Sequence, residues 1–316
     1  MRVAYLGPPG TNSHEALVGA RLDIELVARS TVGSVVGAVQ AGATERGLVP
    51  VENSREGGVG ATLDALVFDA PDVVIVGELV HRVSYCLAAA EPIAPDEVCT
   101  VHSHPQATGQ CARFLSVQLP GAAVVSAAST ADAVRAVAEA GALAGVAPHA
   151  AIGTRHAARL YGAVVLADGV EDDPENATRF AWIARRDAAP ATGNDPHAPP
   201  SASDDRLPRP SASRAPGGSD PTRVPAAAPA HKTALVFWGG GDLAPGWLVD
   251  CLAQFSSRSI NLTRIESRPR RIGLGHYMFF CDLDGAAAQP DVAAAISGLR
   301  GHCETVRVLG SFPVAN

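Results

Sequence analysis

Short apolar runs alternate along the first 186 residues with segments whose apolar side chains recur every three or four positions. The short runs predict buried strands, and the longer period predicts amphipathic helices. Strands are expected at 3–6, 25–28, 47–51, 73–77, 84–88, 98–101, 123–126, 144–147, 163–166 and 180–184. Helices are expected near 13–21, 32–43, 59–69, 105–117, 130–140 and 148–160. Such alternation is typical of an α/β fold with largely parallel sheets, whose ligands lie at the carboxyl ends of strands or between lobes.

The last part of the chain, residues 232–316, has a different order. It predicts strand 233–238, helix 246–257, strands 259–268 and 275–283, helix 290–300 and strand 304–309. The order βαββαβ is the ferredoxin-like split motif. A small module of this kind beside a larger α/β body is more typical of a sensor than of a catalyst.

Residues 187–231 separate these two parts and are rich in Pro, Ala, Ser, Gly and Asp. The segment holds ten prolines and no Phe, Trp or Tyr. Such a composition buries too little apolar area to offset the entropy of ordering, about 1–2 kcal/mol per residue for the backbone alone. We therefore predict three parts: a body at 1–186, a disordered linker at 187–231 and a module at 232–316.

The charge balance narrows the classes of partner. Lysine and arginine number 25 and the acidic residues 32, for a net charge of −7, which disfavours nucleic acid and anionic membranes as partners. Lys232 is the only lysine, so the loop after the first strand lacks a phosphate-binding lysine. Neither a secretory leader nor an apolar run of about 18 residues is found, and the six cysteines are scattered. We expect reduced thiols and a cytoplasmic protein.

Two loops at predicted strand ends carry candidate binding residues. The first runs from Gly7 to Ser13, where glycines and a helix N-terminus suit an anion, although a tight turn with an N-cap explains the same residues. Thr11 is its candidate ligand-binding residue. The second follows the third strand, where Asn53 and Ser54 offer both donors and acceptors.

The segment 172–180 is the most pointed local feature. An acidic loop ends in Thr178 and Arg179 at the mouth of an apolar strand. A threonine hydroxyl can donate a hydrogen bond and an arginine can clamp a carboxylate. The alternative is structural, with Arg179 paired to Asp172 or Asp173.

Cysteines and histidines between Cys99 and Cys111 suggest zinc at first sight. His102 and His104 alternate at a strand end, but the spacing fits no structural zinc pattern. We therefore predict no metal, and we expect Pro105 to open a helix preceded by Ser103 or His104.

Together these segments resemble the prephenate dehydratase family over nearly the whole chain outside the linker. Single motifs would be weak, but several in the right order, followed by the right second domain, make the match specific. In the body they are Gly7-Pro8-Pro9-Gly10-Thr11, Val49-Pro50-Val51-Glu52-Asn53-Ser54, Ser103-His104-Pro105-Gln106-Ala107 with Gln110-Cys111, and Asn176-Ala177-Thr178-Arg179-Phe180. The module is similar to the family's ACT domain in Pro245-Gly246-Trp247-Leu248 and in Asn261-Leu262-Thr263-Arg264-Ile265-Glu266-Ser267-Arg268-Pro269.

The resemblance implies a body of two α/β lobes, similar to periplasmic binding proteins. It implies a carbon–oxygen lyase that turns prephenate into phenylpyruvate in L-phenylalanine biosynthesis, without metal or cofactor. We expect the monofunctional form, because no helical chorismate mutase segment precedes the body. By the resemblance, Thr178 is catalytic and donates a hydrogen bond to the departing C4 hydroxyl. The implied substrate-binding residues are Thr11, Asn53, Ser54, Arg179 and Phe180. Glu52 is expected to orient a neighbour, because a carboxylate beside a dianion would repel it.

The ACT-like module implies feedback by L-phenylalanine, bound between modules of two subunits in a homodimer or homotetramer. The residues that correspond to the family's effector motifs are Gly246, Leu248, Asn261, Leu262, Glu266, Ser267 and Arg268. This chain departs from the family at Trp247, where the family has alanine, and in its long linker. Two other functions stay open: arogenate dehydratase, which shares the chemistry, and a non-catalytic amino-acid sensor on the same bilobed scaffold.

Overall fold

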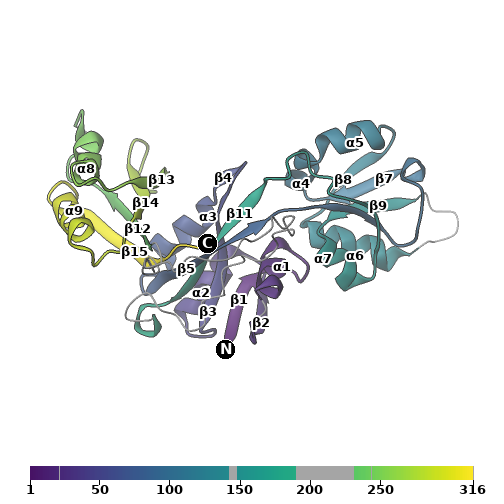
Figure 1. The fold of residues 1–316 in the computed structure, drawn as a ribbon, viewed down its shortest axis with the longest axis horizontal. Helices are drawn as coiled ribbons and strands as arrows, with labels where there is room; N and C mark the ends of the chain where they lie inside the picture. Colours follow the sequence, from purple (N-terminus) through teal and green to yellow (C-terminus); the bar gives the residue numbers. More distant parts are fainter. Residues whose placement is uncertain (21, 142–147, 190–230, 243, 316) are drawn as a thin grey trace, which may run out of the picture. The chain divides into compact units, whose positions relative to one another are not determined.

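The computed structural model describes residues 1–20, 22–141, 148–189, 231–242 and 244–315. They form two compact units, residues 1–74 with 79–189, and residues 75–78 with the described part of 190–316 (Figure 1). The strand expected at 144–147 and nearly all of the linker lie outside the described residues. The linker therefore stays a prediction.

The first lobe of the first unit is built on a mixed sheet. Strand β1 (Arg2–Leu6) lies between β2 (Glu25–Arg29) and β3 (Arg46–Asn53), parallel to both, and β11 (Ala177–Arg185) runs antiparallel to β3. Beyond β11 lies β5 (Val73–Arg82), and β4 (Gly57–Gly58) pairs with β3. The other elements are α1 (Asn12–Gly19), α2 (Val32–Gln40), α3 (Gly60–Asp64) and a π-helical turn (Ala65–Asp69).

The second lobe has a five-stranded sheet in the order β10-β6-β9-β7-β8 (Figure 1). Its strands are β6 (Cys86–Ala89), β7 (Thr100–Ser103), β8 (Ala123–Ser126), β9 (His149–Gly153) and β10 (Val164–Asp168). Its helices are a 3-10 turn (Pro95–Glu97), α4 (Pro105–Gln110), α5 (Ala112–Gln118), α6 (Thr130–Ala140) and α7 (Arg155–Tyr161). As predicted, Pro105 opens α4, and His104 is its N-cap.

Three expectations about local structure were wrong. The sheets are mixed rather than largely parallel, because β11 and β6 each pair antiparallel to a neighbour. The first half of the helix expected at 148–160 is a strand, because residues 149–153 are an apolar segment that pairs with β6 and β7. Thr154 then caps α7, which forms the second half. The helix expected at 105–117 breaks at Cys111, whose backbone angles leave the helical region.

The second unit has the predicted βαββαβ order. It consists of β12 (His231–Trp238), α8 (Trp247–Ser256), β13 (Leu262–Pro269), β14 (Tyr277–Asp284), α9 (Pro290–Arg300) and β15 (Thr305–Pro313). The strands pair antiparallel in the order β13-β14-β12-β15, which is the ferredoxin-like arrangement. Residues of both helices form a core with the sheet, including Phe237, Phe255 and Leu299.

Candidate active site

The pairing of β3 with β11 brings two sequence motifs together. Thr178 lies opposite Asn53 and Arg179 opposite Glu52, although about 125 residues separate them in the chain. The register then shifts between Arg179 and Phe180. This shift places the polar end of β11 beside the loop that follows β3.

A buried amide network holds the hydroxyl of Thr178. The Asn53 side chain, 8% exposed, donates from Nδ2 to Thr178 Oγ1 at 3.0 Å and to Asn176 Oδ1 at 3.0 Å. Since Thr178 Oγ1 accepts that bond, its own hydrogen stays available, and no acceptor for it is found among the described residues. The Thr178 side chain is therefore arranged as a hydrogen-bond donor toward something outside the protein.

The network reaches the second lobe through Gln110. Asn176, 1% exposed, donates from Nδ2 to Gln110 Oε1 at 2.9 Å, and Gln110 Nε2 lies 3.4 Å from Glu56 Oε1. Ser54 Oγ donates to Asn176 Oδ1 at 3.3 Å and accepts from the amide of Ala177 at 3.0 Å. Gln110, at the end of α4, thus joins the two lobes beside Thr178.

The Arg179 guanidinium is paired with Glu52 rather than with the acidic loop. Its Nε and Nη2 atoms donate to Glu52 Oε2 at 3.1 and 3.0 Å. The alternative pairing with Asp172 or Asp173 is not the one observed, and Asp173 instead accepts from Arg55 at 2.8 Å. Glu52 therefore orients the arginine, as expected for a carboxylate that supports a neighbour.

Thr11 and Phe180 occupy different surroundings. Thr11 is the N-cap residue of α1, but its side chain makes no capping bond and donates to the Leu6 carbonyl at 2.9 Å. In the described part of the chain, no hydrogen bond joins it to the Thr178 network. Phe180 is 1% exposed and packs in the core, which does not support the predicted substrate contact.

Side chains around α7 hold the loop that carries Thr11. Gly10 has a φ of +93°, and a Cβ there would lie 3.1 Å from Ala157 Cβ, so the loop needs glycine at this contact. Thr154 Oγ1 donates to the Gly10 carbonyl at 3.1 Å, and the Tyr161 hydroxyl donates to the Pro9 carbonyl at 2.6 Å. This loop of the first lobe is thus bonded to the second lobe.

The two buried cysteines of the first unit, Cys86 and Cys111, are poor nucleophiles. Burial raises the pKa of both Cys86 and Cys111 to about 12, so both stay protonated near neutral pH. No cluster of three metal-ligating side chains occurs among the described residues, and the absence of a metal stays a prediction. In the same residues, no helix is long and apolar enough to cross a membrane.

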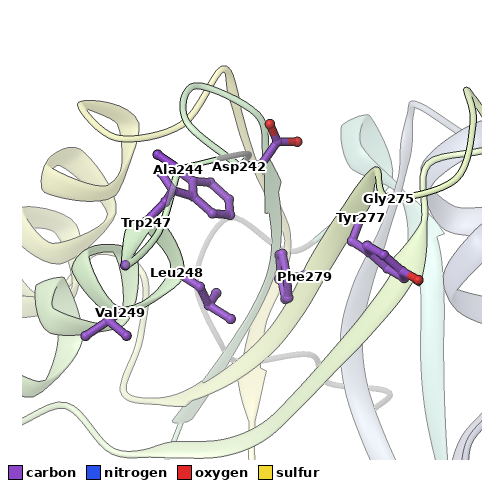
Figure 2. Close-up of a pocket in the computed structure, with 9 residues that line it drawn as sticks. Asp242, Ala244, Trp247, Leu248, Val249, Gly275, Tyr277 and Phe279 are labelled. Atoms are coloured by element: carbon purple, nitrogen blue, oxygen red, sulfur yellow. The ribbon is translucent and has the colours of Figure 1, made fainter.

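The second unit has a pocket of about 190 Å³ at the start of α8 (Figure 2). Trp247, which is 8% exposed, forms one wall; its Nε1 donates to the His302 carbonyl at 2.7 Å, and its ring packs against Phe237 and Phe279. The side chain of Asp242 also lines the pocket, and its Oδ2 has no hydrogen-bond partner among the residues that the structure describes; the Arg270 guanidinium lies 3.7 Å away. An apolar pocket with one carboxylate suits an amino acid with an apolar side chain.

Only part of the predicted effector set lies at this pocket. Gly246 and Leu248 line it. Five others, on or beside β13, do not: Asn261, Leu262, Glu266, Ser267 and Arg268. Asn261 Nδ2 donates to Asp284 at 3.0 Å, and Glu266 accepts from Arg264 at 3.1 Å, so these side chains bond within their own sheet.

Comparison with known proteins decides the family. The family model "Prephenate dehydratase" matches residues 3–188. A prephenate dehydratase of Amycolatopsis methanolica is 37% identical over 319 residues, which cover 100% of this chain and 89% of that protein. The chain belongs to the prephenate dehydratase family. The resemblance inferred from the motifs is confirmed, and with it the carbon–oxygen lyase class.

Solved structures of the family and its relatives match the fold. Prephenate dehydratase from Arthrobacter aurescens, in complex with L-Phe, has a TM-score of 0.78 and 31% identity, covering 100% of this chain and 90% of that chain. A structure described as GqqA, a quorum-quenching acylase, has a TM-score of 0.77 and 27% identity, covering 99% and 98%. The predicted α/β class is confirmed.

The structure brings to the site, or to the loop that carries Thr11, several residues that the sequence did not single out. Gln110 and Asn176 were recognised only as parts of family motifs, yet they connect Thr178 to the second lobe. His14, Thr154 and His156 were not singled out, although His14 follows Thr11 by less than one helical turn. Nothing in the sequence marks Thr154 or His156, because their role depends on contacts about 142 to 144 residues away.

Proposed function

We propose that this chain converts prephenate into phenylpyruvate, with the Thr178 hydroxyl as the catalytic hydrogen-bond donor. The observation that carries the proposal is the Asn53 bond to Thr178 Oγ1, which leaves the hydroxyl hydrogen for a ligand. Prephenate dianion loses its ring carboxylate as CO2 and its C4 oxygen as hydroxide. The electrons of the broken C–C bond complete the aromatic ring, and phenylpyruvate keeps the remaining negative charge.

Thr178 need not transfer its proton for this reaction. A threonine hydroxyl is a very weak acid, but a bond from it to the C4 oxygen strengthens as negative charge develops there. The aromatic ring supplies the driving force. The protein therefore has to hold the dianion and stabilise the departing oxygen.

The remaining predicted residues have separate proposed roles. Arg179 is oriented by Glu52 and binds a substrate carboxylate while it keeps that ion pair. Asn53 positions Thr178, and Thr11 and Ser54 contact the substrate at its edges. Phe180 supports β11 from the core, because its ring is buried.

Regulation by L-phenylalanine is proposed for the pocket of the second unit, which we assign as an ACT domain. The ring of L-phenylalanine lies against Trp247 and Leu248, and its ammonium group is paired with Asp242. The pairing of two subunits, as a homodimer or homotetramer, brings the β13 residues of the predicted set to the effector. We also propose a cytoplasmic location.

The test is turnover by the purified full chain. Prephenate and arogenate are supplied in parallel, with and without L-phenylalanine, while phenylpyruvate and phenylalanine are measured. Phenylpyruvate formation from prephenate supports the proposal, and faster turnover of arogenate supports the alternative dehydratase. Tight binding of an amino acid without turnover of either substrate supports the sensor. Hydrolysis of an acylated homoserine lactone is a further arm, because of the likeness to GqqA.

A further inference from the structure

Two histidines from different lobes meet beside the loop that carries Thr11. His14, on α1, and His156, on α7, approach with Nδ1 and Nε2 at 2.9 Å, and their helices lie side by side in Figure 1. The amide of Gly10 donates to the same His14 Nδ1 atom at 3.0 Å. The His14 ring also stacks on Tyr5, with centroids 5.3 Å apart and planes 19° apart.

These bonds fix which of the two facing ring nitrogens carries a hydrogen. His14 Nδ1 accepts the Gly10 amide, so it carries no hydrogen, and the hydrogen on the neutral ring lies on Nε2. The contact with His156 then requires His156 Nε2 to be the donor. A proton added to His14 Nδ1 removes the acceptor for both partners at once.

Two further side chains bond the carbonyl groups of the loop. Thr154 donates to the Gly10 carbonyl and Tyr161 to the Pro9 carbonyl. The amide of Gly10 therefore depends on the histidines, while the carbonyls depend on residues flanking or ending α7. Thr11 follows directly in the chain, so these bonds hold the backbone on its N-terminal side.

We propose that His14 and His156 are positioning residues for the dehydratase reaction, which hold the Gly10–Thr11 loop in its substrate-binding conformation only while His14 is uncharged. The inference rests on the proposed function and on the proposed substrate contact of Thr11. The histidines touch the loop and each other, and they act on the substrate through Thr11. None of the observations requires either imidazole to exchange a proton with the substrate.

The surroundings agree with uncharged rings. Burial lowers the pKa of His14, and the neighbouring His156 lowers it further, while Glu15 acts in the opposite direction. Burial also lowers the pKa of His156, with Glu15 raising it and Arg159 lowering it. Of the other titratable groups nearby, Tyr5 stacks on His14, Tyr161 is bonded to the Pro9 carbonyl of the same loop, and His81 is paired with Glu15. The lowered pKa values of both rings favour their uncharged forms at pH 7.5, and His14 gains its proton only below its ordinary pKa.

The experiment compares His14→Asn with His14→Leu in the full chain. The Oδ1 atom of asparagine occupies the place of Nδ1 and accepts from Gly10 and His156, but it does not titrate near pH 6. Leucine fills the space without an acceptor. At pH 7.5 we expect His14→Asn to keep KM within about twofold, and His14→Leu to raise KM about fivefold with little change in kcat, as for the loss of one hydrogen bond.

The pH profile separates positioning from a merely structural role. For the wild type, kcat/KM should fall below pH 6.5 as His14 protonates, after subtraction of the enzyme-free reaction of prephenate. His14→Asn should lose most of that acid limb. His149→Asn is the matched control, because His149 Nδ1 meets His102 Nε2 at 3.0 Å in the second lobe away from the loop. It should behave as the wild type.

The inference is overturned if kcat/KM of His14→Asn falls at low pH as it does for the wild type. It is also overturned if His14→Leu has the wild-type KM. If His14→Leu does not fold, the comparison of wild type with His14→Asn decides alone. Failure of the proposed function looks different, because the wild type itself then forms no phenylpyruvate at pH 7.5. Differential scanning calorimetry of each variant confirms that only folded protein is compared.

Discussion

Removal of the Thr178 hydroxyl is the most direct perturbation of the proposed chemistry. Thr178→Ala deletes the donor but leaves the backbone pairing of β11 with β3 in place. Loss of one preorganised donor to a developing oxyanion lowers kcat by about 10²–10³, which corresponds to ~3–4 kcal/mol. We expect a fall in kcat of that size, with KM changed by less than about threefold.

The structure also limits what the same change does to stability. In Thr178→Ala, Asn53 Nδ2 keeps its bonds to Asn176 Oδ1 at 3.0 Å and to the Ala177 carbonyl at 3.2 Å. No buried donor is left without a partner, so the free energy of unfolding should fall by only about 1 kcal/mol. The change should therefore cost about 3–4 kcal/mol of transition-state stabilisation but only about 1 kcal/mol of the free energy of unfolding.

The assay follows phenylpyruvate at saturating prephenate, and urea unfolding of the same samples measures stability. Thr178→Ser is the matched control, since serine keeps the hydroxyl and lacks only the methyl group, and it should retain kcat within about tenfold. Since a threonine hydroxyl does not titrate between pH 6 and 9, the ratio of wild-type to alanine kcat should be constant over that range. Turnover by Thr178→Ala within threefold of wild type would refute the role of the hydroxyl.

Four further predictions test the surroundings of the two sites. Asn176→Ala leaves the buried side-chain oxygen Oε1 of Gln110 without its donor and should lower the free energy of unfolding by about 1–3 kcal/mol in urea titrations. Gly10→Ala should destabilise by more than Gly42→Ala, because both have positive φ but only Gly10 is packed against neighbours; equal losses would contradict this. Asp242→Asn should weaken binding of L-phenylalanine about tenfold in calorimetry while 3-phenylpropionate, which lacks the ammonium group, binds as before. Ellman's reagent at pH 8 should modify an exposed thiol quickly but Cys111 slowly, since burial raises the pKa of Cys111 to about 12; rapid modification of Cys111 would contradict that environment.

The alternation of apolar runs was enough to predict the α/β class and the order of elements in the second unit. Helix α9 has the expected bounds, Pro290–Arg300, because a proline at its first position and apolar residues at helical spacing are local signals. Residues 149–153 show where local signals failed. Their short apolar segment fits a helix or a strand, and the pairing with β6 and β7 decided for a strand.

The candidate site shows the same contrast between local signals and tertiary contacts. The motifs were enough to identify the family, the residue types at the ends of β3 and β11, and Thr178 as a candidate, because each motif is contiguous in the chain. The partners of these residues became known from the folded chain: Glu52 for Arg179, Asn53 for the Thr178 hydroxyl, and the histidine pair beside Gly10. The physical reason is that hydrogen bonds and ion pairs act over about 3 Å in space, and antiparallel pairing and lobe packing bring together residues separated by more than a hundred positions.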